Sequence, residues 1–147
     1  IKYVKPLERT REYVDIIRMI LSGQRVNFEG SVFQLGRFKL PFTPVQENIP
    51  IFMASMGKNN LILTGQIADG WLPTMIHLDH FAEMKSMVER GIVKSGRNID
   101  RILVAPSILT YVSRDRNDYS SGIQLIKAHL AYYTSHGVNV KKTTTMH

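Results

Sequence analysis

Residues 49–75 decide the fold, and they read IPIFMASMGKNNLILTGQIADGWLPTM. The stretch holds two short apolar runs, at residues 51–54 and 70–75, with a helical pattern over residues 61–68 between them. A strand, a helix and a second strand in that order predict a βαβ unit with parallel strands. Neither run alternates with polar residues, so both faces of these strands are expected to be covered.

The segment that precedes this unit predicts a helix, a hairpin and a connector. Pro6 suits the first turn of a helix that ends at Gly23. Residues 25–36 alternate around a turn, which predicts a small hairpin. Residues 39–50 hold three of the six prolines and predict an irregular connector. The apolar stripe expected on the helix consists of Tyr13, Val14, Ile17, Ile20 and Leu21.

The segment that follows the unit repeats the alternation of helix and strand. Asp79 can cap a helix that ends at Gly96, with Phe81, Met84, Val88 and Ile92 as its stripe. A β-rich run over residues 102–112 then predicts a third buried strand. The predicted fold class is therefore α/β, with about three core parallel strands and a small hairpin insertion.

The last part of the chain predicts one more helix and a tail. Asn117 or Asp118 can cap a helix that Gly137 stops, whereas residues 138–147 show no periodicity. Residues 1–137 are therefore predicted to form one domain, and residues 138–147 a frayed tail.

The amino-acid composition excludes several classes of functional site. The 147 residues, 44% of them hydrophobic, can bury a core without a disulfide or a metal. Cysteine is absent, which excludes a thiolate zinc site, an iron–sulfur cluster and a cysteine nucleophile, and suits the reducing cytoplasm that we predict. No apolar run approaches the roughly 18 residues of a membrane span, so no membrane contact is expected.

The net charge of +7 raises the question of whether the protein binds nucleic acid. Residues 1–75 hold nine basic and six acidic side chains, and residues 76–147 hold ten and six, so neither half is a basic arm. No aromatic platform is interleaved with the basic residues. Nucleic acid is therefore not expected as the main partner, and phosphate-bearing small molecules fit at least as well.

The first candidate site runs from Ala54 to Lys58, between the first strand and its helix. In parallel α/β proteins ligands gather at the carboxyl ends of the strands. Small residues and Gly57 let an anion approach the backbone, N–H groups at the helix start can bind phosphate, and Lys58 adds a positive charge. The alternative is an ordinary turn capped by Asn59.

The second candidate site follows the second strand. Trp71, the single tryptophan, can pack in the core or face a planar ligand, and Asp69 can serve merely to turn the chain. His77 is a candidate hydrogen-bond donor or proton shuttle. His77 and His80 lack a third ligand and Asp79 is needed as a cap, so no metal site is predicted. Without paired carboxylates or a nucleophile motif, no catalytic residue is assigned.

Three stretches carry a resemblance to a known family: residues 6–12 (PLERTRE), residues 26–33 (VNFEGSVF), and residues 49–58 (IPIFMASMGK) followed by residues 63–71 (LTGQIADGW). Over about residues 6–115 the chain resembles the carboxyl-terminal part of the bacterial luciferase-like flavin-dependent oxidoreductases. It is most similar to the branch that uses the deazaflavin coenzyme F420, which includes methylenetetrahydromethanopterin reductase.

This resemblance implies a (β/α)8 barrel of which the chain supplies a part, with the cofactor at the carboxyl ends of the strands. It implies coenzyme F420, or alternatively FMN, bound by Ala54, Ser55, Met56 and Gly57, with Leu72 and Pro73 lining the same pocket. The family commonly has Gly-Pro at this turn, whereas here Gly57 is followed by Lys58, which can form a salt bridge to the cofactor.

The expected function is therefore hydride transfer between F420 and a small organic substrate. An FMN-dependent monooxygenase and a non-catalytic flavin-binding or scaffold subunit are the alternatives. Because family members exceed 300 residues and this chain begins at Ile1, it is expected to be a fragment that is inactive alone. It is expected to form a homo-oligomer or to associate with the missing half of the barrel, since open strand edges favour association.

Overall fold

The structure is a computed structural model, and the residues it describes are 4–46, 48–98, 102–113, 115 and 118–135. The chain divides into two compact units, residues 1–106 and residues 107–147. The single domain predicted over residues 1–137 stays a prediction. The predicted tail and the helix stop at Gly137 lie outside the described residues.

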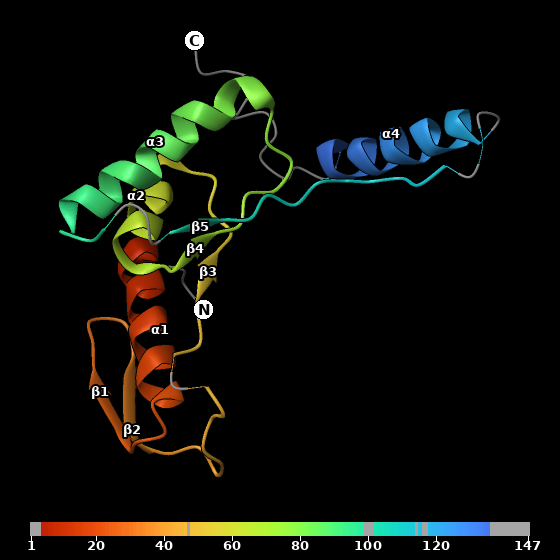
Figure 1. The fold of residues 1–147 in the computed structure, drawn as a ribbon. Helices are drawn as coiled ribbons and strands as arrows, with labels where there is room; N and C mark the ends of the chain where they lie inside the picture. The colour runs from red at the N-terminus through yellow and green to blue at the C-terminus, as the bar shows by residue number, and fades with distance from the viewer. Residues whose placement is uncertain (1–3, 47, 99–101, 114, 116–117, 136–147) are drawn as a thin grey trace. The chain divides into compact units, whose positions relative to one another are not determined.

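The first unit contains three helices and five strands within its described part (Figure 1). In chain order they are α1 (Pro6–Leu21), β1 (Val26–Glu29), β2 (Gln34–Phe38), β3 (Phe52–Met53), α2 (Lys58–Ile67), β4 (Gly70–Trp71), α3 (Leu78–Lys94) and β5 (Leu103–Val104). The predicted α/β class is confirmed, as are the antiparallel hairpin of β1 and β2 and the irregular connector before β3.

The sheet that positions the site has the order β3-β4-β5, and both of its pairings are parallel. Each strand is only two residues long, shorter than the sequence predicted. The expectation that both faces are covered holds for β4, whereas on the edge strands Phe52 is 37% and Leu103 is 59% exposed. Only the central strand has a neighbour on each side, and helices pack against one face of the sheet (Figure 1).

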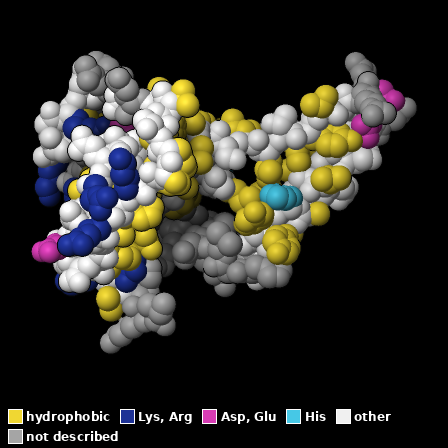
Figure 2. Space-filling view, turned by 90° about the horizontal axis from the view of Figure 1, so that it is seen from below, with side chains coloured by type: hydrophobic (Ala, Val, Ile, Leu, Met, Phe, Trp, Pro, Cys, Tyr) yellow, Lys and Arg dark blue, Asp and Glu magenta, His cyan; other side chains and the backbone are white. Residues whose placement is uncertain are grey.

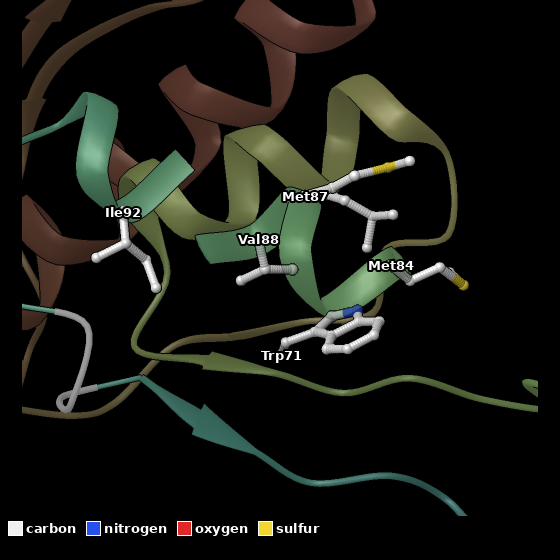
Figure 3. Packing of buried hydrophobic residues seen from close by; sticks show 6 residues of the cluster. Trp71, Met84, Met87, Val88 and Ile92 are labelled. Carbon is white, nitrogen blue, oxygen red and sulfur yellow. The ribbon is translucent and has the colours of Figure 1, made fainter. Parts of the chain in front are cut away.

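The main core lies between this sheet and helices α2 and α3. Its buried members are Leu61, Trp71, Met84, Met87, Val88 and Ile92, and Figure 3 shows Trp71 of β4 facing the α3 side chains. Two glycines allow the helices to approach closely: a Cβ on Gly65 would lie 1.9 Å from the Val88 carbonyl oxygen, and one on Gly91 would lie 2.0 Å from that of Ile62. No side chain larger than hydrogen fits at either position without displacing the backbone.

Helix α1 buries only part of the apolar stripe that was predicted for it, because Val14 is buried whereas Ile20 and Leu21 are half-buried. Its buried residues are Glu12 and Val14, whereas Tyr13 and Ile17 of the predicted stripe are exposed. Val14 packs with Leu63 and Ile67 of α2. The hairpin accounts for the burial of Glu12, which lies outside the predicted stripe.

A buried carboxylate fastens the hairpin to α1. Glu12 accepts hydrogen bonds from the backbone N–H groups of Ser31, Val32 and Phe33 and from the Ser31 hydroxyl, at 2.7–3.2 Å. Burial by itself raises the pKa of Glu12, but these bonds together outweigh it and lower the pKa below its ordinary value of 4.5. Gly30 must lack a side chain because a Cβ there would lie 2.3 Å from the Glu12 carboxylate.

The second unit contains α4 (Tyr119–Ser135), whose bounds agree with the predicted helix where the residues are described. Figure 2 shows apolar side chains gathered along this part of the chain. The large apolar side chains exposed on α4 are Tyr119, Ile123, Leu125, Leu130 and Tyr132.

In the part of the chain that the structure describes, no helix is both long enough and apolar enough to cross a membrane.

Candidate functional site at the carboxyl edge of the sheet

The parallel register brings the two predicted site segments to the same edge of the sheet. Met53 pairs with Trp71, and the N–H of Leu72 donates to the Met53 carbonyl at 3.0 Å. Ala54 therefore leaves β3 beside the point where Leu72 leaves β4. The N–H of Ala105 donates to the Trp71 carbonyl at 2.9 Å, so the chain after β5 joins this edge as well. We call it the carboxyl edge.

Helix α2 begins at this edge without a side-chain cap. Gly57 is the N-cap, and the first backbone bond of the helix runs from the Leu61 N–H to the Gly57 carbonyl at 2.9 Å. Among the described residues no side chain caps α2, so Asn59 does not act as the cap that the alternative reading required. The first turn holds Lys58 and no acidic residue. Its backbone N–H groups, the helix dipole and Lys58 all favour an anion here.

The predicted cofactor-binding residues separate into two groups. Ala54, Met56, Gly57, Lys58 and Leu72 are exposed at the carboxyl edge. Ser55 and Pro73 are buried, so they lie beneath the exposed residues of this edge. Open space surrounds the position of a Cβ on Gly57, which leaves the helix start accessible.

The buried side chains hold the turn from inside. The Ser55 hydroxyl lies 2.7 Å from the Thr64 hydroxyl, and the Trp71 Nε1–H donates to the Ser55 carbonyl at 2.9 Å. Trp71 has no exposed surface and stacks against Phe81 of α3, with ring centroids 5.7 Å apart. It is therefore a core residue and does not face a planar ligand. Thr64 was not singled out in the sequence, because a threonine within a helix gives no local signal of its partner.

The histidines after β4 have a local structural role. His77 is the N-cap of α3 and accepts a hydrogen bond from the Asp79 N–H at Nδ1, so Asp79 is not the cap that we predicted. Asp79 instead lies in the first turn, and its carboxylate is 3.3 Å from the same His77 Nδ1, a contact that is an ion pair only when the imidazole is protonated. Within the described residues no three potential metal ligands come together.

The opposite side of the sheet, the amino edge, contains a charged cluster that the sequence did not predict. The Asp69 carboxylate accepts from the Ile51 N–H at 2.9 Å and from Arg18 at 3.0 Å, and it lies 3.7 Å from Arg97. Arg97 also donates to the carbonyls of Gly65 and Ala68 and so closes the end of α2. Asp69 is thus more than a turn residue.

The electrostatics of Asp69 follow from these contacts. Burial by itself raises the pKa of this carboxyl. The hydrogen bond from Ile51, the hydrogen bond and charge of Arg18, and the charge of Arg97 outweigh it and lower the pKa below its ordinary value of 3.8. The carboxylate therefore stays ionised at neutral pH and links α1, β3, β4 and the residues after α3.

A cavity of about 650 Å³ also lies at the amino edge, and its lining includes Arg18, Asp69 and Arg97. These three charged groups are engaged with one another and with backbone carbonyls. The cavity wall therefore carries stabilising interactions, and the side chains of Arg18 and Asp69 stay partly exposed there.

The family is shown by a comparison of the chain with models of protein families. The model described as luciferase-like monooxygenase matches residues 2–145. The chain belongs to this luciferase-like family. The resemblance of its motifs is confirmed, and the α/β unit with its parallel sheet is the family's barrel architecture in part.

Named relatives refine the position within the family. A 5,10-methylenetetrahydromethanopterin reductase of Archaeoglobus fulgidus is 30% identical over 128 residues, which cover 87% of this chain and 38% of the relative. An F420-dependent hydroxymycolic acid dehydrogenase of Mycobacterium tuberculosis is 37% identical over 91 residues, covering 62% of this chain and 25% of the relative. The expected similarity to the F420-dependent branch is confirmed.

A solved structure shows the same fold. The coenzyme F420-dependent tetrahydromethanopterin reductase of Methanopyrus kandleri superposes with a TM-score of 0.77 at 24% identity, over 96% of this chain and 43% of the reductase. The chain therefore spans well under half the length of the relatives that it matches.

Proposed function

We propose that this chain forms part of a coenzyme F420-dependent oxidoreductase that transfers a hydride between the deazaflavin and a small organic substrate. The proposal rests on the family, on the hydroxymycolic acid dehydrogenase and on the solved tetrahydromethanopterin reductase, both of whose names state F420 dependence. The finer similarity to methylenetetrahydromethanopterin reductase, at 30% identity, supports that substrate class as the first to test.

The observation that carries the proposal is the open start of α2 at the carboxyl edge. Gly57 caps the helix through its backbone alone, and Lys58 adds the one charge of the first turn. N–H groups that lack helical partners, together with a cation and a glycine, match the chemistry of a phosphate group. Coenzyme F420 and FMN both carry a phosphate on the side chain of the ring system, so the residues present fit the group.

Each predicted residue has a role that its burial allows. The backbone of Ala54, Met56 and Gly57 would contact the phosphate and side chain of the cofactor, and Lys58 would form the salt bridge. The exposed Leu72 would give an apolar contact from the neighbouring strand. Ser55 and Pro73 would form the floor beneath the molecule, since their side chains are buried.

Hydride transfer requires little acid–base chemistry from these residues. When bound, F420 supplies the hydride chemistry, and the protein binds, orients and shields it. At the carboxyl edge the backbone and Lys58 would hold the anionic end of the cofactor. Three strands do not close a barrel, so we expect turnover only when further strands complete the pocket, by homo-oligomerisation or by association with the rest of a barrel. A cytoplasmic location stays our prediction.

FMN-dependent monooxygenation is the second candidate, because the matching family is described as luciferase-like monooxygenases. The phosphate site proposed here would bind either cofactor. A test is to titrate F420 and FMN separately into the 147-residue chain and follow the fluorescence of Trp71, the single tryptophan. We expect saturable binding of F420 that is tighter than that of FMN. Tighter FMN binding would favour the monooxygenase, and failure of both to bind would contradict the proposed site and favour a scaffold role.

A further inference from the structure

We propose that Thr64 and Trp71 are positioning residues that fix the cofactor-binding turn, residues 54–57, in its binding shape before any ligand arrives. The consequence for binding rests on the proposed function, whereas the shape of the turn can be measured without it. Neither side chain is exposed, so neither is proposed to touch the cofactor.

The hydrogen-bond directions follow from the chemistry of a hydroxyl. Thr64 Oγ1 donates to the Asn60 carbonyl at 2.8 Å, and a hydroxyl has a single proton to give. The 2.7 Å contact between Thr64 and Ser55 must therefore be a bond that Ser55 donates. The Ser55 hydroxyl is thus committed inward and cannot also donate to a phosphate.

The Trp71 side chain holds Ser55 by the backbone carbonyl of Ser55. Its Nε1–H donates to the Ser55 carbonyl at 2.9 Å, so Ser55 is held at its side chain by α2 and at its carbonyl by β4. The indole stacks on Phe81 of α3 with an angle of 18° between the rings. The turn is in this way attached to both helices that cover the sheet.

Ser55 and its neighbours in the turn differ in their exposure to solvent. Ser55 is 5% exposed, whereas Ala54, Met56 and Gly57 around it are exposed. Anchoring one residue of the turn from inside leaves the groups on either side facing solvent in one conformation. Because ordering a loop on binding reduces affinity, a turn that is ordered beforehand binds more tightly.

Binding tests the proposal with a matched set of variants. Thr64→Val keeps the shape of the side chain but removes both hydrogen bonds, and we expect it to weaken F420 binding about tenfold. Thr64→Ser restores the hydroxyl and should bind F420 nearly as the wild type does. Ile92→Val, which trims the same core in the last turns of α3, is the control for lost packing and should leave the affinity unchanged.

A second variant covers the case in which Thr64→Val does not fold. Trp71→Phe keeps an aromatic ring against Phe81 but removes the donor to Ser55, and should weaken F420 binding about threefold to tenfold. Isothermal titration calorimetry follows this variant, since it lacks the fluorophore. Wild-type affinity in both Thr64→Val and Trp71→Phe would overturn the proposal.

Amide hydrogen exchange without ligand separates this proposal from the proposed function. Thr64→Val should speed exchange of the Leu61 amide, whose bond to the Gly57 carbonyl begins α2, by at least about tenfold, while the Ile92→Val control should not. If wild-type chain binds no F420 but exchange responds in this way, the cofactor assignment fails and the positioning role stands. Unchanged exchange in Thr64→Val would overturn the positioning role whatever the chain binds.

Discussion

The two edges of the three-stranded sheet use their polar groups differently. At the amino edge Asp69 is engaged by Ile51, Arg18 and Arg97, and Arg97 also closes the end of α2. At the carboxyl edge α2 starts with a backbone cap, and Lys58 is exposed beside it. The polar groups of the amino edge are therefore engaged with one another and with the backbone, whereas the start of α2 at the carboxyl edge has only a backbone cap and an exposed lysine.

This division matches the physical roles expected in parallel α/β structures, where binding concentrates at the carboxyl ends of strands and the opposite ends contribute stability. Substitutions at the amino edge should therefore change the free energy of unfolding and leave cofactor affinity alone. Substitutions at the carboxyl edge should do the reverse.

The largest change in the free energy of unfolding should come from disturbing the close packing of α2 against α3, on which both edges of the sheet depend. Gly65→Ala places a Cβ 1.9 Å from the Val88 carbonyl oxygen and forces α2 and α3 apart. We expect the free energy of unfolding to fall by about 3 kcal/mol, measured by urea denaturation. Gly36→Ala in β2, where nothing lies within 4 Å of the new Cβ, is the control and should change it by less than about 1 kcal/mol. Equal losses in the two variants would contradict the close packing.

The amino edge should respond to Asp69→Asn, which keeps the shape but removes the charge that pairs with Arg18 and Arg97. Because the carboxylate is partly exposed, the loss in the free energy of unfolding should be about 1 to 2 kcal/mol. The affinity for F420 in the folded variant should not change. A fall in affinity without a fall in stability would mean that the roles of the two edges are reversed.

The carboxyl edge should respond to Lys58→Ala in the opposite sense. We expect F420 binding to weaken about threefold to tenfold, with less effect at high salt, because one partly solvated ion pair is lost. The free energy of unfolding should change by less than about 0.5 kcal/mol. Lys127→Ala, on the exposed surface of α4, is the matched control and should affect neither quantity. Equal weakening in both variants would indicate only a general effect of charge.

The smallest expected effect is the contribution of Glu12 to the pH dependence of the free energy of unfolding in acid. Its pKa is lower in the folded chain than the ordinary 4.5, so its contribution to stability is present above about pH 4.5 and is lost as the pH falls through the lowered value. Urea denaturation across this range should show stability falling with pH, and a shallower fall in Glu12→Gln. The same change at the exposed Glu29 should leave the slope as in the wild type, and an unchanged slope in Glu12→Gln would contradict the account.

The order of elements could be predicted from the sequence because local signals mark them. Pro6 lies at the start of α1, glycines follow α1 and α3, and apolar runs mark β3 and β4. The position of the turn at residues 54–58 at the carboxyl edge could be predicted because its place between a strand and a helix fixes the edge at which it lies. These are properties of short segments.

The remaining features depend on contacts between distant segments. Glu12 lies outside the predicted apolar stripe of α1, and the hairpin 19 to 21 residues away supplies its donors. Asp69 looked like a turn residue, but its partner Arg18 lies 51 positions earlier. Likewise, nothing local to Ser55 indicates that its hydroxyl faces Thr64. Residue types and spacing within a segment carry no information about such partners.

The central claim is that the carboxyl edge, through the start of α2, binds the anionic end of F420. The most direct measurement is an amide nitrogen–proton NMR titration of the 147-residue chain with F420, read residue by residue. The account predicts saturable shifts concentrated at Ala54, residues 56–61 and Leu72, with little change at Arg18, Asp69 and Arg97. Shifts concentrated around the amino-edge cavity, or no saturable shifts at all, would contradict it.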